Sequence, residues 1–164
     1  MSAFYYKFEV RWSDIDANRH LANSSYVMYC AQTRMAFMNA HNMGVSKLVH
    51  WGIGPVILHE EYSFYKEIMA DQTVYVGLEI SGMSEDSSIY SFTHKFYLPD
   101  GTHCATSKVT GVWIDMMLRK MTTPPDDILV SLLKYKTDQT ELLTKEDLKK
   151  LSNRPENIDP SVFK

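Results

Sequence analysis

The sequence has no run of about 18 apolar residues, so no segment is a candidate membrane-spanning helix. Positive charge is also scarce, because 17 Lys and Arg against 20 Asp and Glu give a net charge of −3. Phosphate recognition needs concentrated Lys and Arg, so this balance excludes a general nucleic-acid binder.

Secretion signals and a cysteine framework are absent as well. The first residues, Met1 to Lys7, contain no apolar segment that ends in a small-residue cleavage site, so we expect no secretion. The two cysteines, Cys30 and Cys104, form neither a disulfide framework nor a zinc signature. We therefore expect a protein of a reducing compartment, the cytoplasm, with no bound metal.

What the chain does contain indicates one globular domain. It has 164 residues, of which 45% are hydrophobic and 23% are charged. We expect a single domain over residues 1–164, with a core from about residue 4 to 118 and a helical tail from about 124 to 164. The aromatic content of 12% fits ordinary core packing, and aromatic strand faces can also hold an oily ligand or a second subunit.

Hydrophobic patterning predicts the order of the elements. Residues 4–12 alternate between apolar and polar, which is typical of a half-buried strand, and Asn23, Ser24 and Ser25 are good helix-cap residues. The expected elements after the first strand are a long helix over residues 26–42, strands over 56–65, 73–82, 88–98 and 103–115, and short helices over 126–135 and 144–151.

The long predicted helix has apolar residues around most of its circumference, so protein must surround it on nearly all sides. Four consecutive strands follow it and can pair antiparallel. One sheet must wrap this helix for both to be buried, which predicts an α+β fold in which an antiparallel five-stranded sheet encloses a long central helix.

The polar stretch between the first strand and this helix holds most of the unusual chemistry. Its carboxylates, amides and imidazole are Asp14, Asp16, Asn18, His20 and Asn23, and Tyr26 follows. This arrangement resembles hotdog-fold acyl thioesterases: the 4-hydroxybenzoyl-CoA thioesterase group, bacterial short-chain acyl-CoA thioesterases and plant acyl-carrier-protein thioesterases. Those families have an Asp-x-Asp pair and a Tyr ten residues beyond the second Asp. The plant-type pattern Asp-x-Asn-x-His with a following Asn matches as well, and the resemblance covers roughly residues 5 to 130.

The resemblance implies hydrolysis of a thioester that links an acyl group to coenzyme A or to a carrier protein. Asp16 would be the catalytic carboxylate, either as general base on water or as nucleophile. Backbone N–H groups at the helix start, from about Asn23 to Tyr26, would stabilise the oxyanion, and His20 and Asn18 would orient the reacting groups. No cofactor is required beyond the coenzyme A of the substrate.

Structural alternatives exist for each of these residues. Asp14 and Asp16 are also the commonest type of cap before a helix, and His20 alone would be an ordinary loop histidine. Asn23 alone would be a helix cap, and Tyr26 is as much a packing residue as a pocket residue.

Three further residues are candidates for substrate binding. Glu60 falls on an otherwise apolar strand face, unless a bulge turns it outward. Arg119 and Lys120 follow the last long strand and could bind coenzyme A phosphates, as such residues do in some relatives, although a solvated strand end explains them equally well.

Two rival functions share this fold. Hotdog hydratases use Asp-x-Asn-Pro-x-His, with the His five residues after the Asp, whereas here His20 follows Asp16 by four residues and the Pro is absent. A non-catalytic acyl-CoA-binding protein is the other rival. Relatives build the pocket between subunits, so the resemblance also implies a homodimer or a dimer of dimers, with a small-molecule acyl-CoA and neither nucleic acid nor membrane as partner.

Overall fold

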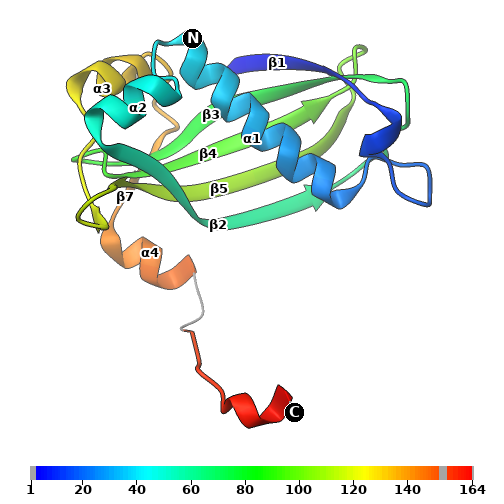
Figure 1. Ribbon diagram of the computed structural model, residues 1–164. Coiled ribbons are helices and arrows are strands. Elements are labelled where there is room, and N and C mark those ends of the chain that lie inside the picture. The colour runs from blue at the N-terminus through cyan, green and yellow to red at the C-terminus, as the bar shows by residue number, and fades with distance from the viewer. Residues whose placement is uncertain (1–2, 152–154, 164) are drawn as a thin grey trace.

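The computed structural model describes residues 3–151 and 155–163. An antiparallel sheet curls around one long helix, and the smaller helices lie at the edges of this unit (Figure 1). The elements in chain order are β1 (Phe4–Glu9), a 3₁₀ turn (Trp12–Asp14), α1 (Asn23–Ala40), α2 (Val45–Trp51), β2 (Ile53–Phe64), β3 (Thr73–Ser84), β4 (Ile89–Tyr97), β5 (His103–Asp115), β6 (Lys120–Met121), α3 (Asp126–Leu133), β7 (Glu141–Leu143), α4 (Lys145–Leu151) and a second 3₁₀ turn (Pro160–Phe163).

The five long strands pair in the order β1-β3-β4-β5-β2, and each pair is antiparallel. Short additions extend the sheet, because β7 pairs parallel with β3 and β6 pairs with β5. The predicted fold, an antiparallel five-stranded sheet around a long helix, is confirmed.

The helix α1 is held by its apolar contacts with the concave face of the sheet. Phe37 lies edge-on to Phe4 with ring centroids 5.6 Å apart, and Tyr29 stacks on Phe8 at 4.1 Å. Val27, Met28 and Met35 on another side of α1 remain exposed. The expectation that protein surrounds α1 on nearly all sides is therefore not met within one chain. The sheet that covers α1 ends at its edge strand β2, so one side of the helix stays exposed.

A bulge between Ile57 and His59 changes the pattern of β2. Leu58 falls in the bulge and is exposed, whereas Ile57 packs against the core. The bulge does not turn Glu60 outward, since its carboxylate forms an ion pair with Arg34 of α1 at 3.6 Å. The bulge therefore directs Ile57 and Glu60, which are three residues apart, toward the inside of the domain, and sequence alternation alone does not reveal this.

Two boundaries differ from the expected ones at the N-terminal end. β1 stops at Glu9, and Trp12 lies in the 3₁₀ turn with its side chain 83% exposed. α1 begins at Asn23 instead of residue 26, and its cap position is Ala22, with no side-chain capping bond. The predicted capping role of Asn23 is therefore wrong, because this residue is already the first residue of the helix.

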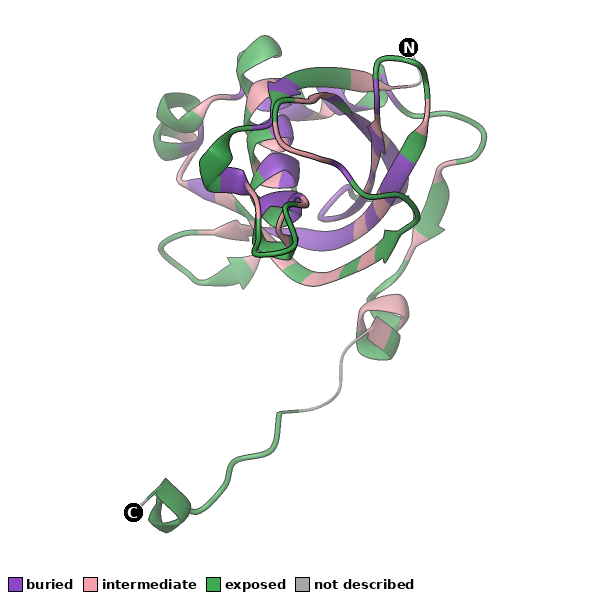
Figure 2. Cartoon of the chain, turned by 90° about the vertical axis from the view of Figure 1, so that its right-hand side faces the viewer, coloured by how far each residue is buried: buried purple, intermediate pink, exposed green. Residues whose placement is uncertain are grey.

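The packed core continues past residue 118. Ile128 and Leu132 of α3 are buried in the same cluster as Phe37. Thr144 and Asp147 form a capping box at the start of α4, with the Thr144 amide donating to Asp147 Oδ2 at 2.9 Å. Beyond α4, residues 155–163 are exposed and lie away from the domain (Figure 2).

Candidate active site

The loop that carries Asp16 is fixed by its own backbone. The Asp16 amide donates to the His20 carbonyl at 2.9 Å, and Arg19 takes the left-handed φ of 66° that closes the turn. Asp16 Oδ1 accepts bonds from the backbone N–H groups of Asn18, at 2.8 Å, and His20, at 3.2 Å. One carboxylate oxygen is therefore held in an Asx turn, and Oδ2 has no hydrogen bond to any described residue.

Asp14 has a structural environment that differs from that of Asp16. It is buried and accepts hydrogen bonds from the Arg11 backbone amide at 2.9 Å and from the Tyr29 hydroxyl at 2.9 Å. Burial opposes ionisation, but these bonds and the Arg11 guanidinium outweigh it and lower the pKa of Asp14. Asp14 thus ties the loop to α1 as an ionised anchor, which agrees with the structural alternative for this residue.

His20 is oriented by a residue from another part of the chain. Its Nε2 lies 3.0 Å from Oε2 of Glu67, a residue of the connection between β2 and β3. The backbone of His20 also forms a β-bridge with Met69 of the same connection. The adjacent Leu21 amide donates to the Ile68 carbonyl at 2.7 Å. These contacts hold the Asp16 loop against the end of β2.

An open pocket of about 310 Å³ lies between this loop, the first turn of α1 and the end of β2. Its lining residues are Asp16, His20, Leu21, Asn23, Tyr26, Phe64, Tyr65, Lys66 and Glu67. Tyr26 forms the floor, with its ring centroid 4.9 Å from Phe64 and 5.0 Å from Phe96. Burial raises the pKa of Tyr26 to about 12, so its hydroxyl stays protonated at neutral pH.

Asn23, the first residue of α1, lines the same pocket, so the N-terminus of the helix borders it. The Ser25 amide already donates to the Ala22 carbonyl at 2.8 Å, whereas the first amides of an α-helix, here those of Asn23 and Ser24, lack an acceptor within the helix. Such amides, together with the helix dipole, favour a developing negative charge. A carboxylate and an anion-binding helix end therefore border one cavity.

The structure brings together four of the predicted site residues, Asp16, His20, Asn23 and Tyr26. Asn18 contributes only its backbone amide to Asp16 and does not line the pocket. Glu60 pairs with Arg34 further along β2. Arg119 and Lys120 lie at the opposite end of the sheet, because Asp115, just before them, pairs with Ile53, whereas Ala105 pairs with Phe64 beside the pocket. One chain does not bring these last three residues to Asp16.

Sequence reasoning missed the pocket residues at the end of β2 and directly after it, namely Phe64, Tyr65, Lys66 and Glu67. Only the cluster of aromatic and charged residues across the end of the predicted strand 56–65 could have indicated them. Within residues 3–151 and 155–163, no three His, Cys, Asp or Glu side chains are arranged to bind a metal ion. None of the described helices is both long and apolar enough to cross a membrane.

Comparison with known proteins places this geometry in a family. The family model of the thioesterase-like superfamily matches residues 10–132, which include the Asp16 loop, α1 and the five-stranded sheet except β1. The chain belongs to the thioesterase-like superfamily. Its predicted class, thioester hydrolase, is confirmed by this membership. A search of curated proteins found no match.

Solved structures with the same hotdog fold confirm the architecture of this thioesterase-like protein. A Staphylococcus aureus protein in complex with CoA aligns with a TM-score of 0.77 at 18% identity, over 93% of this chain and 96% of that one. A 1,4-dihydroxy-2-naphthoyl-CoA thioesterase from Synechocystis gives a TM-score of 0.73 at 14% identity, over 80% and 96%. A putative thioesterase from Pseudomonas aeruginosa gives 0.69 at 22% identity, over 78% and 96%.

Proposed function

We propose that this thioesterase-like protein hydrolyses acyl-CoA thioesters in the cytoplasm, with Asp16 as the catalytic carboxylate. The observation that carries the proposal is the free Oδ2 of Asp16 in a pocket that also receives the first turn of α1. The similar Staphylococcus aureus protein in complex with CoA supports coenzyme A as the thiol carrier. Cys30 and Cys104 are both free and buried, which is compatible with a reducing compartment.

In the proposed reaction the thioester carbonyl lies against the amides of Asn23 and Ser24. These amides stabilise the negative charge that develops on the carbonyl oxygen. Asp16 Oδ2 either takes a proton from the attacking water or attacks the carbonyl carbon itself. The thiolate of coenzyme A leaves and takes up a proton. In the nucleophilic route water then hydrolyses the anhydride between the acyl group and Asp16, so in both routes the acyl group is released as a carboxylate. His20, held by Glu67, lies at the same pocket and positions the water or the leaving group.

We also propose that two copies associate through β2. The outer edge of β2 pairs with no described strand, and the exposed apolar side chains near it include Val27, Met28, Leu58 and Phe64. An unpaired apolar edge of this length is a site for pairing with another strand. In a two-fold dimer the two β2 strands run antiparallel, so the Arg119 end of one subunit approaches the Asp16 end of the other. Arg119 and Lys120 would then be available to coenzyme A phosphates across the interface.

The test of the dimer is the molar mass in solution. Light scattering at micromolar concentration is expected to give at least twice the chain mass of 18.9 kDa. Leu58→Asp, which places a charge on the exposed apolar edge, is expected to shift this mass towards the monomer. A wild-type monomer at that concentration contradicts the association.

The test of catalysis is Asp16→Asn, which keeps an oxygen to accept the turn bonds but removes the negative charge. Thiol release from a series of acyl-CoA substrates is expected to fall by about 10³-fold or more, as for loss of a primary catalytic group. Asp71→Asn is the matched control, because Asp71 is an exposed loop carboxylate outside the pocket. Circular dichroism checks that both variants fold.

Unchanged thiol release by Asp16→Asn removes this residue from the mechanism. Tight acyl-CoA binding by the wild-type protein without thiol release would instead favour a non-catalytic acyl-CoA-binding role. Comparing acyl-CoA with acyl-carrier protein in the same assay identifies the thiol carrier.

A further inference from the structure

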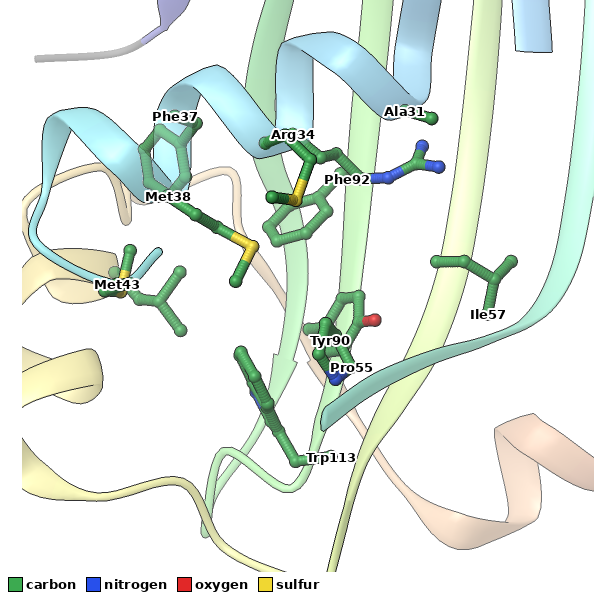
Figure 3. Close-up of a pocket in the computed structure, with 12 residues that line it drawn as sticks. Ala31, Arg34, Phe37, Met38, Met43, Pro55, Ile57, Tyr90, Phe92 and Trp113 are labelled. Carbon is green, nitrogen blue, oxygen red and sulfur yellow. The ribbon is translucent and has the colours of Figure 1, made fainter. Parts of the chain in front are cut away.

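A second pocket lies under the C-terminal half of α1 and is distinct from the Asp16 pocket. Its volume is about 220 Å³, and it shares no lining residue with the Asp16 pocket in one chain. The residues that line it come from α1, the connection between α1 and α2, β2, β4, β5 and α3 (Figure 3): Ala31, Arg34, Met35, Phe37, Met38, Met43, Pro55, Ile57, Tyr90, Phe92, Trp113 and Leu132. An apolar cavity of about 150 Å³ is sufficient to bind benzene, so this pocket has room for a small organic molecule.

The walls are apolar or aromatic except for Arg34, yet three polar atoms in them have no partner. These atoms are the Tyr90 hydroxyl, Trp113 Nε1 and Arg34 Nη1, which are buried and make no hydrogen bond to any described residue. Tyr90 and Trp113 are 1% and 3% exposed, respectively, so bulk water does not solvate their polar atoms. Buried donors of this kind normally bond to protein, ordered water or a ligand.

The positive charge of Arg34 is incompletely matched. Its ion pair with Glu60, the one that it forms among the described residues, has an N–O distance of 3.6 Å, which is too long for a good hydrogen bond. The guanidinium and the Tyr90 hydroxyl lie on the same side of the pocket, while the side chains of Met38, Met43 and Trp113 lie on the other (Figure 3). One side of the pocket therefore offers donors and positive charge, and the other offers an apolar wall.

The position of the Tyr90 hydroxyl is fixed by Gly111 on the neighbouring strand. Tyr90 and Gly111 are paired across β4 and β5. A Cβ atom at position 111 would lie 2.6 Å from the Tyr90 oxygen and 2.5 Å from the Val56 carbonyl oxygen. The absence of a side chain at Gly111 is what allows the hydroxyl to occupy this place at the pocket wall.

We propose that this pocket binds a small apolar carboxylic acid. The hydrocarbon part fills the space between the methionines and Trp113, and the carboxylate accepts hydrogen bonds from Arg34 Nη1 and the Tyr90 hydroxyl. Arginine is well suited to this task because its planar donors match the geometry of a carboxylate. This site goes beyond the hydrolytic activity, since its ligand binds without a thioester and without Asp16.

The experiment uses the full chain and phenylacetate as probe, with 2-phenylethanol as a neutral molecule of similar size. Binding is measured by calorimetry and by tryptophan fluorescence, which senses Trp113 in the pocket wall. We expect phenylacetate to bind at least ten-fold more tightly than 2-phenylethanol. Arg34→Gln is expected to remove this preference, and Tyr90→Phe to reduce it several-fold, while the control Lys136→Gln, at an exposed residue outside both pockets, leaves it unchanged.

Asp16→Asn separates the two pockets, because it is expected to bind phenylacetate as tightly as the wild type does. Equal binding of the acid and the alcohol, or no binding of either, overturns the proposal and leaves water as the partner of the buried donors. Binding that is lost in Asp16→Asn and kept in Arg34→Gln also overturns it, since the acid then occupies the catalytic pocket. If Arg34→Gln does not fold, Tyr90→Phe decides between these outcomes.

Discussion

His94 is expected to make the stability of the fold depend on pH. It lies on β4 between Leu78 of β3 and Ser107 of β5, is 0% exposed, and neither ring nitrogen has a hydrogen-bond partner among the described residues. Burial, and secondarily the positive charge of Arg34, lowers the pKa of His94 from 6.5 to about 3. The ring is therefore neutral in the folded protein at physiological pH.

The sign of the effect follows from the two pKa values. Between pH 6.5 and about 3 the unfolded chain binds a proton at His94 that the folded chain does not bind. Acidification through this window therefore favours unfolding, with a slope of about 1.4 kcal/mol per pH unit. From neutral pH to pH 5 the loss from this one side chain is about 2 kcal/mol.

Urea unfolding at pH 7.5 and pH 5.0 measures this loss. His94→Leu has a similar volume and no titratable group, so its free energy of unfolding is expected to fall by about 2 kcal/mol less than that of the wild type between the two pH values. His50→Gln is the matched control, because His50 is exposed on α2. A pH response of His94→Leu that equals that of the wild type refutes the reasoning, since the ring is then partnered or charged in the folded state.

Two pairs of substitutions and one truncation test further features of the fold. Asp14→Asn weakens the charge-assisted bonds from Arg11 and Tyr29 and is expected to destabilise the fold by about 2 kcal/mol in urea unfolding, while Tyr29→Phe, which loses one of these bonds, is expected to cost about 1 kcal/mol. Gly111→Ala forces a Cβ to 2.5 Å from the Val56 carbonyl oxygen and is expected to lower the melting temperature by several degrees, whereas Gly54→Ala, which meets only the flexible Met116 side chain at 3.0 Å, is expected to lower it less. Removal of residues 155–164 is expected to leave the melting temperature within about 1 °C of the full chain, because residues 155–163 are exposed.

The element order and the short-range part of the site could be predicted from the sequence because both depend on local pattern. Asp16, His20 and Asn23 lie within eight residues, so any loop that enters α1 keeps them near one another. Glu67 could not be predicted as the partner of His20, since their contact depends on how the sheet curls.

Two further differences between the predicted and the observed structure have physical causes that the alternation of apolar and polar residues does not encode. The bulge at Leu58 is an inserted residue in the pairing of β2 with β5, and it changes the phase of the strand without any Gly or Pro as a signal. Arg119 and Lys120 were predicted at the site from resemblance, but their distance from Asp16 in one chain follows from the length of β5. At about 3.3 Å per residue, the ten residue-to-residue steps from Ala105 to Asp115 span about 33 Å.

The self-contained turn around Asp16 has a consequence for how such a protein diversifies. The carboxylate depends for its orientation on amides only two and four positions away, while Phe64, Tyr65 and Lys66 arrive from a remote strand end. Mutations that reshape the cavity can therefore accumulate at that strand end without moving the Asp16 carboxylate. Under the proposed function, selection can change which molecules enter while the carboxylate that cleaves them is inherited intact.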